Sequence, residues 1–209
     1  MKITKKWLKE NHVWKEIIEW FENQKEKETG GIKIIKKLKK EKELTWAIQL
    51  ILQMLKSKQC VSFSIFAAEL VLPIFEKQYP EDVRPRKVIE LAKECIIGLT
   101  ELDISNAAVY ASVYAKEVEN LSDFISSKAD ELDRHAIASA TALIAVVFAA
   151  EGAVYFAGSG YSLTQICAIG AYGWAVSAAS YDYKNPLITE KQFQLKILNY
   201  GIKLLEKKK

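Results

Sequence analysis

The sequence predicts an all-α protein, a single-domain multi-helix bundle with tightly packed alanine-rich helices in its C-terminal half. Glycine (9) and proline (4) are scarce among the 209 residues, and apolar residues recur at steps of three and four. No stretch alternates apolar and polar residues over the length of a convincing strand. Half of the residues are hydrophobic and 27% are charged, a composition typical of a globular protein. We expect one domain over residues 1–209, with residues 1–42 as an N-terminal helical extension.

The first 55 residues predict three or four helices. Large apolar residues recur at helical steps between about residues 4 and 27, so one or two amphipathic helices are expected there, ending at Thr29-Gly30-Gly31. A short basic helix follows, with apolar residues among its lysines. Thr45 is a candidate N-cap for a mostly buried helix that continues to Leu55.

The strongly apolar stretch over residues 60–78 contains Pro73, which should kink this helix or start a new segment. Pro80 should end it, because the residue before a proline is disfavoured in the helical region. Asp82 can accept hydrogen bonds from the free amides of the next helix, and Pro85 suits a first helical turn. That helix is expected to run to about Gly98.

Small residues dominate residues 106–179, and they allow helices to approach closely, so two or three packed alanine-rich helices are expected. Two membrane spans are the alternative, because residues 135–158 are about as long as the roughly 20 residues that a bilayer needs. Glu151 would be costly in lipid, which favours a soluble protein. The last helix, capped by Thr189, should carry an apolar stripe of Phe193, Ile197, Leu198, Ile202 and Leu205.

The net charge of +4 is unevenly spread, since residues 25–43 carry eight lysines against four glutamates. This segment predicts a solvated helix face or, alternatively, a surface that attracts polyanions or acidic proteins. The three cysteines, Cys60, Cys95 and Cys167, lie in apolar helical stretches and predict buried, inert thiols in a reducing compartment. Because no apolar secretory signal opens the chain, we expect a cytoplasmic protein.

No catalytic motif is found, so no enzymatic activity, metal or cofactor is expected. His12 and His135 lack the neighbouring cysteines or acids of a zinc site. Gly158-Ser159-Gly160 lacks the lysine and the strand-to-helix setting of a phosphate loop and should connect two helices. A charged patch should favour the positive end of an alanine-rich helix; it consists of Asp130, Glu131, Asp133 and Arg134.

The candidate binding residues are one buried acid, one charged motif and several aromatic residues. Glu69 lies in an apolar helix and needs a partner or a wet crevice, so it either pairs with Arg84 or Arg86 or faces a ligand. The aromatic residues either pack in the core or line a pocket or docking face, because Tyr, Trp and Arg dominate binding hot spots. The full candidate set is Glu69, Tyr79, Asp82, Arg84, Arg86, Tyr110, Tyr114, Tyr155 and Trp174.

Residues 46–96 resemble a known family. The resemblance rests on Trp46, on FAAELVLPIFEK (residues 66–77) and on Tyr79-Pro80-x-Asp82-x-Arg84-Pro85-Arg86 followed by an apolar helix. In these features the chain resembles the immunity-protein-five-like family of bacterial polymorphic-toxin loci and of phage and prophage genomes. The later alanine-rich helices and KILNYGIKLL (residues 196–205) are also similar to that family.

The resemblance implies an all-helical, non-enzymatic protein that binds and blocks another molecule. Our first hypothesis is a protein that neutralises a toxin or defence effector by steric occlusion, through a face that combines Arg84, Arg86 and nearby aromatic residues. The alternative is a phage-encoded counter-defence protein that sequesters a small anionic nucleotide signal, since arginine binds phosphate and aromatic rings stack on bases. Neither hypothesis needs a specific nucleic acid or a membrane as partner, and a homo-oligomer is left open.

Overall fold

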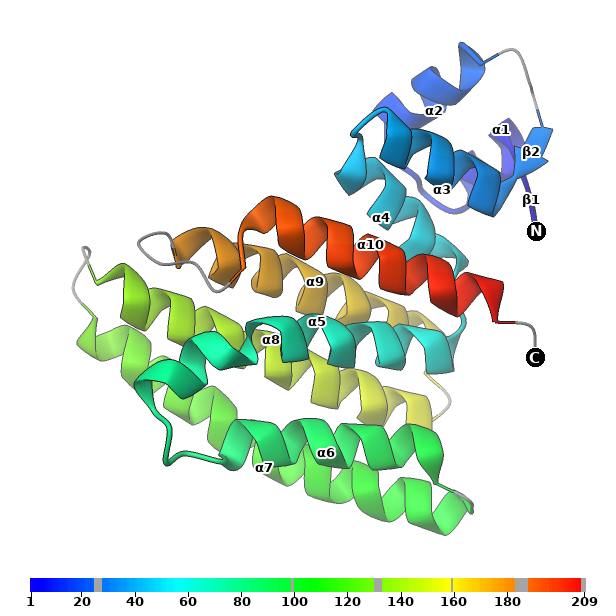
Figure 1. Ribbon diagram of the computed structural model, residues 1–209. Coiled ribbons are helices and arrows are strands. Elements are labelled where there is room, and N and C mark those ends of the chain that lie inside the picture. The colour runs from blue at the N-terminus through cyan, green and yellow to red at the C-terminus, as the bar shows by residue number, and fades with distance from the viewer. Residues whose placement is uncertain (25–27, 99, 130–132, 159, 183–187, 208–209) are drawn as a thin grey trace. The chain divides into compact units, whose positions relative to one another are not determined.

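A computed structural model describes residues 1–24, 28–98, 100–129, 133–158, 160–182 and 188–207 (Figure 1). These residues form ten helices and one short two-stranded sheet, so the predicted all-α, multi-helix class is confirmed. The chain divides into two compact units. The small unit is Met1–Leu55 with Gln194–Lys209, and the large unit is Lys56–Phe193. This division into compact units does not test whether residues 1–209 form one domain, so the single domain stays a prediction.

The small unit consists of short elements with large buried side chains. Its members are β1 (Lys2–Thr4), α1 (Lys5–Glu10), α2 (Lys15–Glu22), β2 (Glu28–Gly30), α3 (Gly31–Lys40), α4 (Leu44–Met54) and most of α10 (Glu190–Glu206). β1 and β2 are antiparallel, with Ile3 opposite Thr29. The sequence did not predict this sheet, because strands of three residues are too short to show an alternating pattern.

Two boundaries in the small unit differ from the prediction. Gly31 begins α3 instead of ending a helix, and a Cβ at this position would collide with the side chain of Met54. In the α3–α4 turn, Lys42 adopts the left-handed region (φ 68°), and the backbone amide of Glu43 donates a hydrogen bond to the carbonyl of Leu38 at 3.0 Å. This tight turn starts α4 at Leu44, so the predicted cap at Thr45 is wrong.

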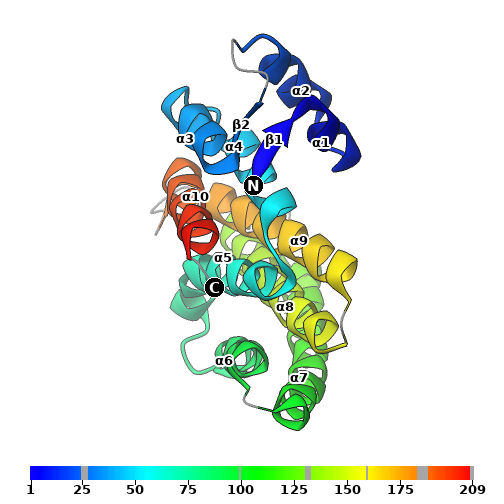
Figure 2. The ribbon, with the colours of Figure 1, turned by 90° about the vertical axis from the view of Figure 1, so that its right-hand side faces the viewer.

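The large unit is a bundle of long helices. It comprises α5 (Ser57–Gln78), α6 (Arg84–Ile97), α7 (Glu101–Lys128), α8 (Arg134–Ala157), α9 (Tyr161–Tyr181) and the first turn of α10. In Figures 1 and 2, α8 lies between α7 and α9 with α5 beside it, and α7 lies at one edge next to α6 and α8. Small residues permit this close packing. A Cβ added at Gly170 of α9, for example, would lie 2.6 Å from the ring of Phe148 of α8.

The predicted helix boundaries of the large unit are mostly confirmed. α5 ends at Gln78, and Tyr79 before Pro80 leaves the helical region (φ −128°, ψ 64°). α5 continues through Pro73, so the expectation of a new segment there is wrong. Pro73 is exposed, and the carbonyl that it deprives of a donor lies on the same solvent-facing side of the helix.

Side-chain caps account for three further helix starts. Asp133 accepts a hydrogen bond from the amide of Ala136 at 3.0 Å at the start of α8, as predicted, while Asp130 and Glu131 lie outside the described residues. Thr189 and Gln192 cap each other at the start of α10, which confirms the predicted cap. α7 begins at a capping box formed by Thr100 and Asp103, several residues earlier than expected. α8 ends at Ala157 and α9 begins at Tyr161, so Gly158 and Gly160 lie in the connection, as predicted.

The three cysteines are free and buried, as predicted. Burial raises the pKa of the Cys60 and Cys167 thiols to about 12 and that of Cys95 to about 11. At neutral pH these groups are therefore protonated and poorly nucleophilic.

Two described helices, α5 and α8, are long and apolar enough to cross a bilayer when judged by length and composition. In the structure, 61% and 72% of the residues in their most apolar windows are buried inside the protein. Buried core helices of bundles share this composition, so neither helix is strong support for a membrane span. α9, the second helix of the predicted alternative, does not meet the same criterion.

Candidate functional site

The charged motif from Tyr79 to Arg86 forms the turn between α5 and α6. Asp82 accepts a hydrogen bond from the backbone amide of Arg84 at 3.1 Å, and its carboxylate binds the Arg84 side chain with Nε–Oδ1 and Nη2–Oδ2 distances of 2.9 and 2.5 Å. The hydrogen bonds from the Arg84 side chain are the main reason why the pKa of Asp82 is lowered. Pro85 lies in the first turn of α6. The predicted role of this motif in starting α6 is confirmed.

Two ion pairs connect α5 and α6. Glu76 binds Arg86 in a two-pronged arrangement with both N–O distances at 2.7 Å, and Glu69 binds Lys93 at 2.5 Å. The glutamates are seven residues apart on α5 and their partners seven residues apart on α6 in the reverse order, as an antiparallel helix pair requires. The predicted pairing of Glu69 with Arg84 or Arg86 is therefore wrong, because both arginines bind acids closer to the turn.

Aromatic residues lie on both sides of this junction. Tyr79 stacks on Phe75 with ring centroids 5.0 Å apart. On the other side, Lys87 of α6 donates a hydrogen bond to the Tyr114 hydroxyl of α7 at 2.8 Å, and its Nζ lies 4.4 Å from the ring centroid. The hydrogen bond to Tyr114 raises the pKa of Lys87, and the charge of Glu117 contributes to the raised pKa of both Lys87 and Arg84. The structure thus gathers most of the predicted binding residues around the α5–α6 turn and the middle of α7.

A row of exposed apolar side chains runs along the outer face of α7. We call it the α7 stripe; it consists of Leu102, Val109, Val113 and Phe124, which are 56 to 69% exposed. At 3.6 residues per turn these four positions lie within about 60° of one another around the helix. Tyr110, 58% exposed, and Ile97 at the end of α6, 69% exposed, lie beside the stripe. Single exposed apolar residues are common, but a contiguous patch marks interaction surfaces. Val109 and Val113, one turn apart with Tyr110 beside them, form such a patch, while the exposed Asn106 and Asn120 separate Leu102 and Phe124 from it.

The sequence analysis did not identify the α7 stripe, because it considered only the small residues of this segment and their close packing. α7 buries its small residues, among them Ala107, Ala111 and Ala115, against the neighbouring helices. The large residues lie on the opposite side of the same helix. The signal was present in the sequence: a row of alanines at helical steps, with Val109 and Val113 about half a turn away from it.

Two hollows border the α7 stripe. The hollow of about 450 Å³ beside Tyr110 lies between the end of α6 and the start of α7 and is lined by Glu94 and Asp103 among others. The hollow of about 370 Å³ on the other side lies between α7 and α8; Lys116, Glu119, Glu151 and Tyr155 contribute to its lining. Burial, together with the charge of Glu119, raises the pKa of Glu151. Both hollows therefore carry acidic groups.

The remaining candidates lie elsewhere. Trp174 is exposed on α9, and none of the hollows described here is lined by it. His135 lies 3.8 Å from the buried carboxylate of Asp182, and His12 occupies a left-handed turn position (φ 50°) between α1 and α2. Within the described part of the chain, no group of three or more His, Cys, Asp or Glu side chains could hold a metal ion.

The fold and this surface define an all-helical scaffold with an exposed apolar and acidic face. A family model described as "Imm-5 like putative immunity protein" matches residues 50–159. The match covers more than half of the chain, so the protein belongs to this family, as the sequence resemblance indicated. The matched residues include every predicted binding residue except Trp174. No curated protein and no solved structure matches the chain.

Proposed function

We propose that the protein is a non-enzymatic, cytoplasmic immunity protein that binds a toxin or defence effector and blocks it by covering its working surface. The observation that carries this proposal is the α7 stripe, an unpartnered apolar face within the residues that the family model matches. Three buried, unpaired cysteines fit a reducing compartment.

The α7 stripe offers enough apolar surface to anchor a protein partner. Each of its side chains contributes about 1.5–3 kcal/mol when it passes from water to full burial. Part of this gain is offset by the loss of rotational and translational freedom on association. Tyr110 and Tyr114 extend the face toward α6, and tyrosines are frequent anchors in protein interfaces.

The charges around the stripe favour a basic partner surface. α7 carries five acidic residues and two lysines, and one of those lysines, Lys116, already binds Glu119 at 2.6 Å. The large unit as a whole has seventeen Asp and Glu against twelve Lys and Arg, a formal charge of −5. Charge complementarity of this kind raises association rates and selects among partners. We therefore expect the neutralised protein to present lysines or arginines around an apolar contact.

The motif arginines lie at the α5–α6 turn, next to Lys87, which binds Tyr114 of α7. Arg86 is half exposed and uses Nε and Nη2 on Glu76, and a guanidinium has five N–H donors in total. We propose that Arg84 and Arg86 add hydrogen bonds at the edge of the interface rather than at its centre, because their own acids already balance their charge.

The test is binding to, and protection from, any candidate toxin encoded by the genes that neighbour that of this protein. Val109→Asp with Val113→Asp places two charges in the α7 stripe and should abolish both binding to the purified toxin and protection of cells that express it. Ile166→Asp with Ile169→Asp makes the same change at exposed positions of α9 outside the matched residues and should leave both intact. Circular dichroism spectra identify a variant that has lost its fold. Equal protection by the two double variants would contradict the proposal.

The nucleotide alternative finds little support at this site. The arginines of the motif bind Asp82 and Glu76, and the hollow beside Tyr110 contains Glu94 and Asp103. These carboxylates repel a phosphate. The tyrosine and arginine residues of the large unit therefore favour a protein partner over a small anion.

A further inference from the structure

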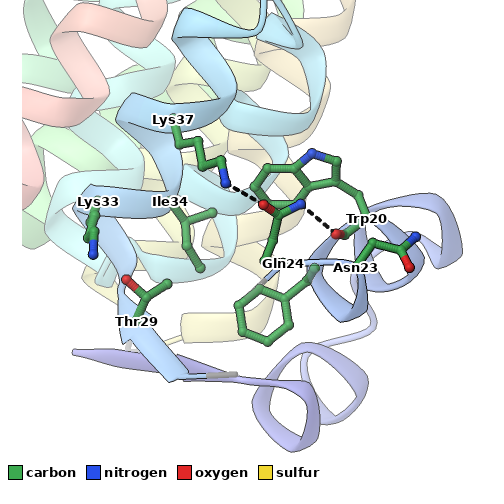
Figure 3. Close-up of a pocket in the computed structure, with 8 residues that line it drawn as sticks. Trp20, Asn23, Gln24, Thr29, Lys33, Ile34 and Lys37 are labelled. Atoms are coloured by element: carbon green, nitrogen blue, oxygen red, sulfur yellow. Dashed lines mark hydrogen bonds between the residues drawn. The ribbon is translucent and has the colours of Figure 1, made fainter. Parts of the chain in front are cut away.

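A pocket of about 410 Å³ opens in the small unit, between α2 and α3 (Figure 3). This volume lies within the roughly 300–1,000 Å³ typical of small-molecule sites. The pocket lies outside residues 50–159, so it is independent of the family match and of the proposed binding face. Its lining combines aromatic, apolar, amide and basic side chains: Trp20, Phe21, Asn23, Gln24, Thr29, Lys33, Ile34 and Lys37.

A chain of contacts fixes the Trp20 ring at one end of the pocket. Its Nε1 donates a hydrogen bond to Glu41 at 2.9 Å, and the Lys37 ammonium lies 5.6 Å from the ring centroid. Lys37 also binds the Gln24 side-chain oxygen, while the Gln24 amide nitrogen donates to the Trp20 carbonyl at 2.8 Å. An aromatic ring held in this way is ready to stack on a planar ligand without a further loss of side-chain entropy.

The opposite end of the pocket is suited to an anion. Figure 3 shows Lys33 and Thr29 at this end, with Ile34 between them and the Trp20 end. Lys33 and Lys37 are one turn apart on α3, so their ammonium groups leave the same side of the helix. The Lys33 ammonium and the Thr29 hydroxyl are suitable donors for phosphate oxygens, while the Lys37 ammonium lies at the Trp20 end and adds its positive charge from there.

The charge of the whole small unit supports an anionic ligand. It contains eighteen lysines and nine glutamates, a formal charge of +9. A field of this sign raises the local concentration of anions and their association rate. Two lysines of α3 outside the pocket bind polar groups of α10: Lys36 binds Glu206 at 2.8 Å, and Lys39 binds Asn199 at 2.6 Å. The pocket is thus a part of this basic unit in which lysines accompany an aromatic ring.

We infer that this pocket binds a nucleoside monophosphate or a close chemical analogue. The base stacks on Trp20 and contacts the apolar side chain of Ile34, the Asn23 amide meets its polar edge, and the phosphate binds Lys33 and Thr29. An amide side chain carries both a donor and an acceptor, so it can meet the edge of any base.

The test measures the contribution of the base and that of the phosphate to binding separately. Isothermal titration of the full-length protein with AMP, adenosine and ribose 5-phosphate should show AMP binding at least about tenfold more tightly than either fragment, because each fragment keeps only one of the two contacts. GMP, CMP and UMP in the same assay rank the bases. Absence of AMP binding at millimolar concentration, or equal affinity for AMP and ribose 5-phosphate, would overturn the inference.

Variants locate the binding within the molecule. Lys33→Glu with Lys37→Glu should weaken AMP binding by at least about tenfold, and Trp20→Leu should weaken it while removing the quenching of tryptophan fluorescence by the base. Lys40→Glu changes an exposed lysine of α3 that does not line the pocket and serves as the matched control. Lys33→Glu alone repeats the test if the double variant does not fold. An equal loss with Lys40→Glu, or tight binding of single-stranded oligonucleotides that is insensitive to Trp20→Leu, would replace the pocket by a general polyanion surface.

Discussion

The small and large units build helices from different residues. The small unit has helices α1 to α4 of six to eleven residues, held by large buried side chains such as Phe21, Ile35 and Ile48. The large unit has helices α5 to α9 of 14 to 28 residues, and eight of the fourteen buried residues of α8 are alanine. The units also differ in formal charge, +9 against −5.

These differences have a common physical basis in how each unit fills its interior. Short helices bury few residues, so each residue has to contribute a large apolar side chain. Long helices that approach closely gain contacts along their whole length, and alanine leaves the room for that approach. We therefore expect the small unit to be most sensitive to lost volume and the large unit to added volume. Large apolar residues that find no room inside the large unit lie on its surface, as in the α7 stripe.

The largest effect is expected from removing volume in the small unit. Ile48→Ala deletes most of a fully buried side chain of α4 and should lower the free energy of unfolding by about 2–5 kcal/mol. Tryptophan fluorescence during urea unfolding reports on this unit, since four of the five tryptophans lie in it. Thr45→Ala on the exposed side of the same helix is the control and should change the free energy by less than about 0.5 kcal/mol.

The next effect comes from adding volume to the large unit. Ala145→Leu introduces three carbon atoms at a fully buried position of α8 and should cost about 1–3 kcal/mol, because neighbouring helices have to move apart. Ser126→Leu on the exposed face of α7 adds a leucine without this conflict. Circular dichroism at 222 nm during thermal unfolding compares the two variants. A melting temperature that is unchanged in Ala145→Leu would show that α8 is less tightly packed than its alanines indicate.

Local sequence signals predicted the fold well, because helix punctuation depends on neighbouring residues. Pro80, Asp82 and Pro85 act within one turn of their own positions, and the structure confirms each. The pairing of β1 with β2 joins residues that are 26 positions apart in the sequence, such as Ile3 and Thr29, and no local pattern predicts this pairing.

The candidate site was less predictable because it depends on which helices are neighbours. Lys93 is the partner of Glu69 only because α5 and α6 are antiparallel. The α7 stripe faces solvent only because α7 is an edge helix, and the Trp20 pocket exists only because side chains of α2 and α3 line the same hollow. Tertiary arrangement therefore decides features that residue types alone leave open.

A smaller effect is expected at the α5–α6 turn. Asp82→Ala removes the acceptor of the Arg84 amide and should lower stability by about 1 kcal/mol at neutral pH. The pKa of Asp82 is lowered in the folded protein, so the ionised form is the favoured one. Its contribution is present above the unfolded pKa of about 3.9 and is lost as the pH falls through the folded value. Denaturation curves of the native protein and the variant should therefore converge below about pH 4; a constant difference would show that the carboxylate charge is not responsible.

The smallest effect, and the one of opposite sign, is expected at Glu151 in the hollow between α7 and α8. Burial and the nearby charge of Glu119 raise the pKa of Glu151, so folding favours its protonated form. The associated stability is present below the unfolded pKa of about 4.3 and is lost as the pH rises through the folded value. At pH 7 this favourable contribution is reduced, although Lys116 lies in the same hollow; Cys167 on α9 stays uncharged.

Glu151→Gln should therefore raise the melting temperature at pH 7 and have little effect below about pH 4. Glu90→Gln, at an exposed position of α6, removes the same charge and is the control. A similar increase in both variants would assign the effect to the net charge of −5 on the large unit. An increase in Glu151→Gln alone would assign it to burial. In that case the close approach of alanine-rich helices, which stabilises the large unit elsewhere, is locally unfavourable at Glu151, because it partly buries an ionisable carboxyl group.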